Sequence, residues 1–310
     1  MRVLVYGAGV QGSVYGAILA ERGHEVSFLA RGERARQLRS GGLTIHGVLG
    51  DRDVRLTRPV VVEALDPHDD FDLCLVTVRG EQVDAILPAL ARSAVTRVVF
   101  MHNHANGSER LARTVGAQRT VIAFPGAGGS LEPDGVVQYA LIAEQPTMVG
   151  RSPSSPDAAA PVVQSFRAAG LRVSVVDDAD AWLRRHAVLV AAVSGALWRY
   201  DCDPARLVAA RDGVPDFIRA VREGYAALDA AQVAPEPLAL RAIFRWVPLP
   251  LATAYWRRYL SGTHGEIVFA AHVRHAAGEM AAIADEASAI MRETNVPTPT
   301  FDRLRRAIPA

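Results

Sequence analysis

The chain has 310 residues, of which 50% are hydrophobic and 22% are charged, a composition typical of globular proteins. This length is sufficient for two domains, each with its own core. The formal net charge of +1 gives no reason to expect nucleic acid or an anionic membrane as a partner. The sequence contains no lysine, so arginine supplies all 34 strongly basic side chains.

The two cysteines and the N-terminal residues indicate the cellular compartment of the protein. Cys74 and Cys202 have no neighbouring metal ligands, and we expect them to be free thiols of a reducing compartment. The chain enters a strand directly, without the pattern of a signal peptide, and no apolar stretch is long enough to cross a bilayer. We therefore expect a cytoplasmic protein that binds no membrane and no metal.

A glycine motif follows the first predicted strand, Arg2–Tyr6. Gly7 permits a tight turn, and Gly9 lets the backbone approach a pyrophosphate. Gly12 lets the next helix pack closely on the sheet, with its N-terminus facing the phosphates. That helix is predicted over Val10–Arg22. The predicted cofactor residues in this stretch are Gly7, Gly9, Val10, Gln11 and Gly12.

The second predicted strand, His24–Ala30, indicates which dinucleotide binds. A site for NAD places an acid at the end of this strand, whereas a site for NADP places a cation there to meet the 2′-phosphate. Here the strand ends in Arg31, with Arg34 and Arg36 just beyond it. A guanidinium binds phosphate through two hydrogen bonds, so the sequence predicts NADP(H). The alternative is a solvated basic turn.

The rest of the first half alternates strands and helices, as a parallel sheet requires. A helix is expected over Gln82–Arg92 and a loop over Pro125–Gly129. Val136–Ile142 and Pro146–Gly150 are expected to be antiparallel edge strands. The remaining predicted strands are Asp72–Val78, Arg97–Met101, Arg119–Phe124 and Leu171–Val176.

From Asp177 onward strand signals vanish and apolar residues recur at helical spacing. Helices are predicted over Ala181–Trp198, Phe217–Ala230 and Ile267–Met291, with a break at Phe244–Pro250. The predicted fold class is α/β: a Rossmann-type, doubly wound parallel sheet in residues 1–177, followed by an all-helical domain in residues 178–310. A catalytic cleft is expected between the strand ends and the helical domain.

Two candidate site segments directly follow strands. Arg79 is expected to lie along the cofactor phosphates, or else to be a solvated basic residue. Asn103 could hold the nicotinamide or a substrate carbonyl through its amide. His102 and His104 flank it, but two histidines at this spacing without a third ligand do not make a metal site.

Together these residues resemble the ketopantoate reductase family, whose members reduce 2-dehydropantoate to pantoate with NADPH on the way to pantothenate and coenzyme A. The resemblance covers almost the whole chain and implies a Rossmann domain, a helical C-terminal domain for substrate and dimerisation, and commonly a homodimer. It is carried by Gly7–Gly12, Gly23–Val26, Arg31, Val76–Arg79, His102–Asn103 and Val296–Pro299.

The resemblance also locates a departure in the catalytic helix. The family's catalytic lysine falls on Arg184, and two family asparagines fall on Val188 and Ala192. These three positions share a helix face, predicted to form one pocket wall. Arginine stays protonated, so it could polarise the ketone or grip the substrate carboxylate but would not donate the proton. The proton would then come from water or from another side chain, of which His104 is preferred over His186. The alternative is that Arg184 is a surface residue without a catalytic role.

The family's substrate-binding glutamate falls on Glu279, twenty residues before Pro299. His272, His275, Glu279 and Glu286 also form a polar stripe at helical spacing, so a solvated helix face is the alternative. The predicted activity is reduction of a small 2-oxo acid by NADPH, with Arg184, Glu279 and Asn103 at the substrate. 2-Dehydropantoate is the substrate that the resemblance implies. The alternatives are a less hydroxylated 2-oxo acid, or an NADP(H)-binding sensor without turnover.

Overall fold

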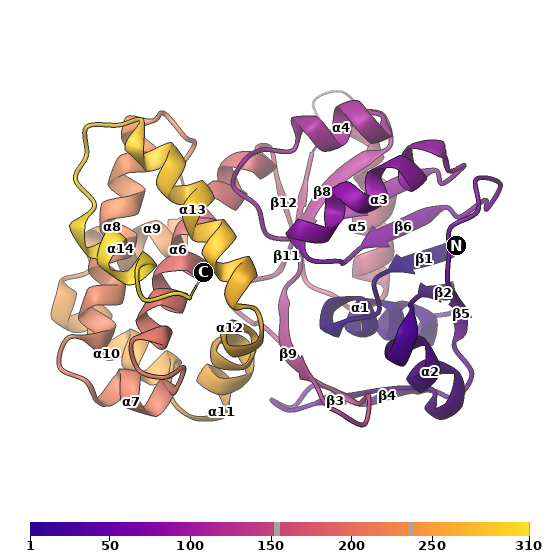
Figure 1. Ribbon diagram of the computed structural model, residues 1–310, viewed down its shortest axis with the longest axis horizontal. Helices are drawn as coiled ribbons and strands as arrows, with labels where there is room; N and C mark the ends of the chain where they lie inside the picture. The colour runs from indigo at the N-terminus through magenta and orange to yellow at the C-terminus, as the bar shows by residue number, and fades with distance from the viewer. Residues whose placement is uncertain (152–155, 236–237, 310) are drawn as a thin grey trace. The chain divides into compact units, whose positions relative to one another are not determined.

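The computed structural model describes residues 1–151, 156–235 and 238–309, which fall into two structural units (Figure 1). The first contains residues 1–102 and 108–179. The second contains everything from Asp180 onward, together with the short segment Asn103–Gly107. Five residues from the middle of the chain are therefore part of the second unit.

The first unit is built on an eight-stranded sheet in the order β12-β11-β8-β7-β6-β1-β2-β5. Neighbouring strands are parallel except for the antiparallel pair β8 and β11. The central strands are fully buried because they are almost entirely apolar. The strands are β1 (Arg2–Tyr6), β2 (Glu25–Leu29), β5 (Val60–Val62), β6 (Leu73–Val76), β7 (Arg97–Phe100), β8 (Thr120–Phe124), β11 (Thr147–Gly150) and β12 (Val173–Val176).

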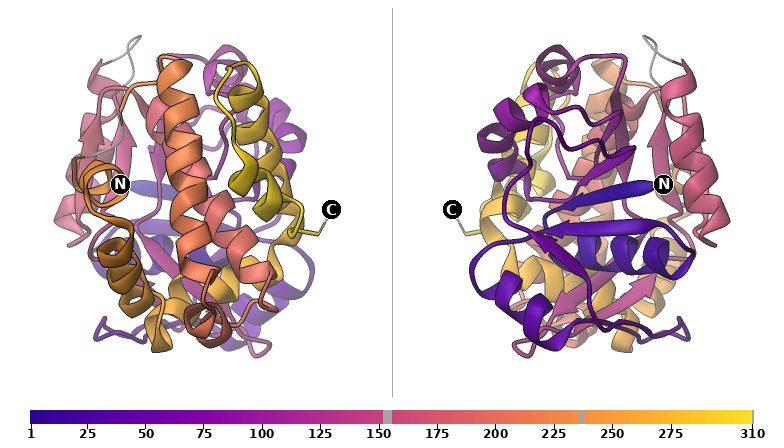
Figure 2. Two further views of the ribbon diagram at one scale, coloured as in Figure 1. Left: turned by 90° about the vertical axis from the view of Figure 1, so that its left-hand side faces the viewer. Right: turned by 90° about the vertical axis from the view of Figure 1, so that its right-hand side faces the viewer.

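Strand β1 lies where the chain reverses its direction across the sheet. From β1 the chain proceeds outward to β2 and β5, then returns to the other side of β1 as β6. Figure 2 (right) shows β1 and β2 side by side. Ligands of doubly wound sheets bind beside the carboxyl ends of the strands at such a reversal. The helices of this unit are α1 (Val10–Glu21), α2 (Gly32–Gly41), α3 (Gly80–Arg92), α4 (Glu109–Val115), the 3₁₀ turn η1 (Pro156–Ala158) and α5 (Ala160–Ala168).

A second, four-stranded sheet was not expected from the sequence. Its order is β4-β3-β10-β9, with β3 (Leu43–Gly47), β4 (Val54–Leu56), β9 (Ala127–Leu131) and β10 (Val137–Leu141). The prediction of a loop over Pro125–Gly129 was therefore wrong for its second half. β10 lies inside this sheet, parallel to β3 and antiparallel to β9, rather than at an edge. Helix α1 packs against β1 and β2 and against all four strands of the small sheet.

All described secondary-structure elements of the second unit are helices. Helix α8 packs against α10, α13 and α14 (Figure 2, left). The break expected at Phe244–Pro250 is present, because the chain is extended at Val247 and Pro248 before α10 begins. The elements are α6 (Ala179–Trp198), α7 (Pro204–Ala209), α8 (Gly213–Ala230), α9 (Leu238–Arg241), π-helical η2 (Ala242–Trp246), α10 (Leu249–Tyr259), α11 (Gly262–Gly265), π-helical η3 (Glu266–Ala270), α12 (Ala271–His275), α13 (Ala277–Arg292) and α14 (Pro299–Arg305).

The single helix predicted over Ile267–Met291 was wrong. The helix is interrupted at Ala276, whose backbone lies at φ −129° and ψ 39°, outside the helical region. η3 and α12 precede this point and α13 follows it. Alanine is the best helix former, so the residue itself gives no signal of the break.

Candidate cofactor and substrate site

The turn after β1 is held from two sides. Gly7 has φ +105°, which favours glycine, and its N–H donates to the carbonyl of Leu29 at 3.2 Å. The hydroxyl of Thr77 donates to the Gly7 carbonyl at 2.6 Å. A Cβ added at Gly7 would lie 2.9 Å from Val78 Cγ1. The ends of β2 and β6 therefore fix the glycine turn at the reversal point of the sheet.

The other two glycines of the motif have opposite surroundings. A Cβ at Gly12 would lie 2.0 Å from the Gly7 carbonyl oxygen and 2.6 Å from Thr77 Oγ1, so this position has no room for a side chain. A Cβ at Gly9 would meet nothing within 4 Å. Gly9 is also the N-cap of α1, and no side chain caps that helix. The open space and the uncapped helix N-terminus fit the phosphates of a dinucleotide.

The side chain of Gln11 stabilises the fold. Its Nε2 donates to the carbonyl of Ala127 in β9 at 2.8 Å, which ties the first turn of α1 to the small sheet. Its Oε1 is buried without a hydrogen-bond partner among the described residues. Val10 and Gln11 form the first turn of α1, so their backbone N–H groups are the ones that a bound phosphate would use.

Arg31 stands two residues after the end of β2, as the N-cap of α2. Its Nε donates to the carbonyl of Glu63 at 3.0 Å, and no described residue accepts a hydrogen bond from its two terminal nitrogens. Burial raises the pKa of Tyr6 at the end of β1, and the charge of Arg31 partly offsets that rise. The guanidinium is therefore close to the end of β1 and has both terminal nitrogens left to donate to an anion.

The two neighbouring arginines are engaged within the protein. Arg36 pairs with Glu33 on the surface of α2. Arg34 donates to the carbonyls of Ala8 and Gly135, each at 2.8 Å, and to Ser13 Oγ at 2.9 Å. The Arg34 guanidinium thus joins the glycine motif, α1 and the small sheet.

Replacing Arg34 by methionine is expected to lower the free energy of unfolding by about 2–4 kcal/mol, because two carbonyls and a hydroxyl lose their charged partner. Denaturant unfolding measures this loss. Arg36→Met is the matched control, since it removes only an exposed pair, and we expect a change below about 0.5 kcal/mol. Equal, small losses in both variants would show that Arg34 does not hold the motif.

Arg79 begins α3 and remains largely exposed, its Nη1 lying 3.8 Å from Glu81 Oε1. Its N–H donates to Gln82 Oε1 at 3.2 Å, and Gln82 N–H donates back to its carbonyl at 2.9 Å. This reciprocal cap fixes the backbone that carries the guanidinium. A role of Arg79 at the cofactor phosphates stays a prediction.

The segment that carries Asn103 is fastened to two helices of the second unit. Glu286 on α13 accepts hydrogen bonds from Ala105 N at 2.6 Å and from Asn106 Nδ2 at 3.1 Å. Arg184 on α6 donates from Nε to the Ala105 carbonyl at 3.2 Å. We call residues 103–107 the clamped segment. The sequence interpretation left Glu286 on a polar stripe, and its clamping role was missed.

Arg184 therefore has a defined position rather than a free surface location. A Cβ added at Gly107 would lie 3.7 Å from Arg184 Nη2 and 3.5 Å from Asp180 Oδ2. No described residue accepts a hydrogen bond from the terminal nitrogens of Arg184. Asp180, one helical turn before Arg184, also lies 4.0 Å from the Nε2 of His104.

The pocket wall predicted on α6 is not formed at the two positions that follow Arg184 on the same helix face. Val188 and Ala192 are fully buried in the core of the helical unit. A Cβ added at Gly224 of α8 would lie 2.5 Å from Val188 Cγ1, so Val188 packs tightly against α8. These two positions therefore contribute to the helical core rather than to a pocket wall.

Glu279 lies in the first turn of α13, largely buried, with its Oε2 3.7 Å from His272 Nε2. Glu286 lies seven residues later, on the same helix face and about 10 Å along the axis. The carboxylate that contacts the clamped segment is that of Glu286. A substrate contact of Glu279 stays a prediction.

His186 is stacked on Trp182, with ring centroids 4.8 Å apart and planes inclined by 11°. Complete burial lowers its pKa from 6.5 to about 3. The imidazole is therefore neutral near pH 7, which makes it a poor proton donor.

A buried neutral histidine makes stability depend on pH. Its pKa in the folded protein lies below the value of 6.5 for an exposed imidazole, so the unfolded chain binds the additional proton as the pH falls below 6.5. We expect His186 to lower the free energy of unfolding by up to about 1.4 kcal/mol for each pH unit between its pKa in the unfolded chain and its pKa in the folded protein. Urea unfolding of His186→Phe, which keeps an aromatic ring beside Trp182, should show a weaker loss of stability at acid pH. Identical pH dependence in both proteins would contradict the assignment.

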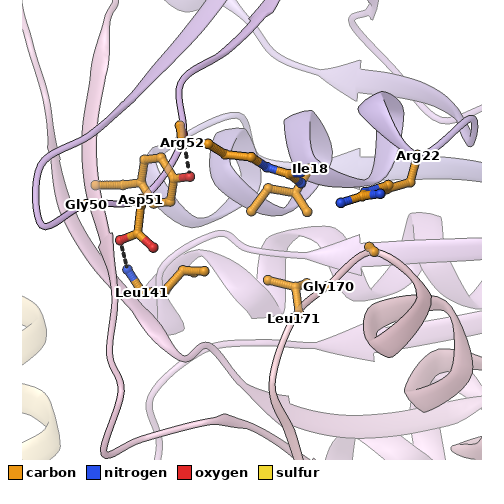
Figure 3. A pocket seen from close by; sticks show the side chains of 10 residues that line it. Ile18, Arg22, Gly50, Asp51, Arg52, Leu141, Gly170 and Leu171 are labelled. Atoms are coloured by element: carbon orange, nitrogen blue, oxygen red, sulfur yellow. Dashed lines mark hydrogen bonds between the residues drawn. The ribbon is translucent and has the colours of Figure 1, made fainter.

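A cavity of about 250 Å³ lies elsewhere in the first unit (Figure 3). Two hydrogen bonds join residues of its lining: Leu141 N–H donates to Asp51 Oδ2 at 2.8 Å, and the Tyr139 hydroxyl donates to the Arg52 carbonyl at 2.8 Å. Its lining contains none of the predicted site residues. The lining residues are Ile18, Arg22, Gly50, Asp51, Arg52, Tyr139, Leu141, Ala169, Gly170 and Leu171.

Comparison with known proteins places this geometry in a family. Residues 3–154 match the family described as ketopantoate reductase PanE/ApbA. This segment of the chain belongs to the ketopantoate reductase family. The chain is 28% identical over 194 residues to 2-dehydropantoate 2-reductase of Archaeoglobus fulgidus, and 25% identical over 185 residues to that of Pyrococcus horikoshii. These matches cover 62% and 59% of this chain and 62% and 58% of the two relatives, less than two thirds of their length.

Solved structures of ketopantoate reductases share the fold over nearly the whole chain. 2-Dehydropantoate 2-reductase from Geobacter metallireducens superposes with a TM-score of 0.78 at 18% identity, covering 99% of both chains. A structure of D-mandelate dehydrogenase with NADH and anilino(oxo)acetate gives a TM-score of 0.77 at 18% identity, covering 99% of this chain and 97% of that one. At this identity the likeness establishes the fold.

Three further observations concern membrane spans, metal ligands and cysteines. None of the described helices is both long and apolar enough to span a membrane. Within the described residues, no group of three or more His, Cys, Asp or Glu side chains could hold a metal ion. Both described cysteines are free and buried.

Proposed function

We propose that this protein is an NADPH-dependent reductase of a 2-oxo acid. The observation that carries the proposal is the glycine turn, open above Gly9 and followed by Arg31 with both terminal nitrogens left to donate to an anion. The family match of residues 3–154 supports it. 2-Dehydropantoate is the first candidate substrate, because two relatives of this chain are named for that reaction.

The first unit supplies the groups that would hold NADP(H). The backbone N–H groups of Val10 and Gln11 would bind the pyrophosphate, and Arg31 would bind the 2′-phosphate. Arg79 would add a second cation along the phosphates. When bound, NADPH supplies the hydride that reduces a ketone.

The second unit supplies groups suited to a 2-oxo acid. Arg184 is fixed through its Nε, which leaves the terminal nitrogens to grip a carboxylate or polarise a ketone oxygen. The amide of Asn103 and the carboxylate of Glu279 would orient the substrate through hydrogen bonds. All 34 strongly basic side chains are arginine, so no lysine can act as the proton donor.

A less hydroxylated 2-oxo acid is the second candidate substrate. The resemblance aligns two amide side chains with Val188 and Ala192, which here are apolar and buried in the helical core. Because neither buried position can offer a hydrogen bond to the hydroxyl groups of pantoate, the chain lacks the two partners that the resemblance implies. This favours a substrate without those hydroxyls.

Purified protein with NADPH and a panel of 2-oxo acids tests the proposal. The panel should include 2-dehydropantoate and branched or aromatic 2-oxo acids without further hydroxyls, and loss of reduced-cofactor absorbance reports turnover. We expect oxidation with at least one member of the panel. Tight NADPH binding without oxidation by any member would instead support a sensor without turnover.

We also infer a homodimer formed through the helical unit. Trp246 and Leu251 are each 63% exposed and Tyr255 is 44% exposed. Leu251 and Tyr255 are four residues apart on α10 and so share a helix face. We expect sedimentation to show a dimer that Leu251→Glu converts to monomers, whereas Leu131→Glu, at an exposed leucine of the first unit, should not change the mass. A monomeric native protein would contradict the inference.

A further inference from the structure

We propose that His104, paired with Asp180, donates the proton to the substrate ketone in place of the lysine that this chain lacks. The inference deepens the proposed reductase function and rests on it. It concerns the clamped segment and helix α6, both of which belong to the second unit.

His104 is buried next to the start of helix α6. Its side chain is 6% exposed, and its Nε2 lies 4.0 Å from Asp180 Oδ1. The next residue along the segment, Ala105, is the one whose carbonyl accepts the hydrogen bond from Arg184. Asp180 precedes Arg184 by one turn of α6. The histidine–carboxylate pair therefore stands beside the position where the resemblance expects the catalytic amine.

A second feature is the rigidity of this arrangement. Glu286 binds the N–H of Ala105 at 2.6 Å and the amide of Asn106 at 3.1 Å, while Arg184 binds the Ala105 carbonyl. Helices α6 and α13 thus hold the backbone on the C-terminal side of His104. A proton donor needs a fixed position, because proton transfer requires hydrogen-bond distance to the reacting oxygen.

A third feature is the charge around the imidazole. Asp180 and Arg184 on α6 and Glu286 on α13 are the charged groups that contact the clamped segment or approach it. The Asp180 carboxylate, 4.0 Å from Nε2, attracts the positive charge of an imidazolium, and this attraction opposes the effect of burial.

The proposed reaction transfers one hydride and one proton to the ketone. The ketone carbon gains a hydride from NADPH, the carbonyl π bond breaks, and the oxygen takes the proton of the His104 imidazolium. The products are the 2-hydroxy acid, NADP⁺ and neutral His104, which regains a proton from water. Arg184 stays protonated throughout and stabilises the negative charge that develops on the oxygen.

The variants His104→Gln and Asp180→Asn test the assignment, with His102→Gln as the matched control on the other side of Asn103. We expect His104→Gln to lower kcat about 100-fold or more with unchanged affinity for NADPH. The wild type and His102→Gln should lose activity as the pH rises through the titration of the imidazolium, and His104→Gln should lack that limb. Added imidazole should partly restore His104→Ala.

A second readout does not depend on turnover. The His104 resonances, followed by NMR as a function of pH in the wild type, should titrate at lower pH in Asp180→Asn, because the pairing carboxylate is gone. Full kcat and an unchanged pH profile in His104→Gln would overturn the assignment while leaving the reductase function intact. A wild type that reduces no 2-oxo acid would overturn the reductase function, and an unchanged His104 titration in Asp180→Asn would overturn the pairing independently.

Discussion

Replacing Gly9 by alanine is expected to weaken NADPH binding about 100-fold, which corresponds to about 2.7 kcal/mol, while leaving stability almost unchanged. A methyl group there meets no protein atom within 4 Å, and the backbone at φ −73° accepts alanine. The same methyl would occupy the space through which a pyrophosphate reaches the N-terminus of α1. Fluorescence titration with NADPH and denaturant unfolding measure the two quantities separately.

Two further glycines complete that experiment. Gly12→Ala should lose stability as well as binding, since its Cβ would lie 2.0 Å from the Gly7 carbonyl oxygen. Gly41→Ala, at the end of α2, also has open space around its Cβ and should change neither quantity. An unaltered NADPH affinity in Gly9→Ala would show that the turn does not hold phosphate.

Replacing Arg31 by aspartate is expected to weaken NADPH binding by about 10- to 100-fold and NADH binding far less. Only NADPH carries the 2′-phosphate, and the aspartate would add repulsion to the loss of the guanidinium. Arg36→Asp, at the fifth residue of α2, is the control, because Arg36 already pairs with Glu33. Dissociation constants for both cofactors measure the selectivity, and equal losses for NADPH and NADH would refute the 2′-phosphate assignment.

The parallel sheet could be predicted because strands buried on both faces are recognisable in a sequence as runs of apolar residues. Leu73–Val76 and Thr120–Phe124 are such runs, and the α/β class with a helical second half was confirmed. The small second sheet could not be predicted in the same way. The glycines at the start of β9 were interpreted as a loop, but a Cβ at Gly129 would lie 2.3 Å from the Gln138 carbonyl oxygen. Glycine is needed there because β9 and β10 approach closely.

In the candidate site, too, local motifs could be predicted and residues that act through tertiary contacts could not. The glycine motif and Arg31 are local features, so the spacing of residues was enough to propose them. Glu286 and Asp180 depend on tertiary contacts with the clamped segment, more than 70 residues away from each of them in the chain. Glu279 was selected by its spacing to Pro299. Helical spacing cannot distinguish a carboxylate that clamps a backbone from one on a solvated face, so nothing local marked Glu286.

Transfer of deuterium tests the central claim most directly. Purified protein would be supplied with NADPH deuterated at one of the two C4 positions, each in turn, together with the 2-oxo acid that gives the fastest turnover. Mass spectrometry of the product would locate the label. A reductase of the kind proposed here would place deuterium from one of the two forms of NADPH on C2 of the 2-hydroxy acid. A product without deuterium from either form, or NADPH that remains bound and unoxidised, would contradict the assigned function.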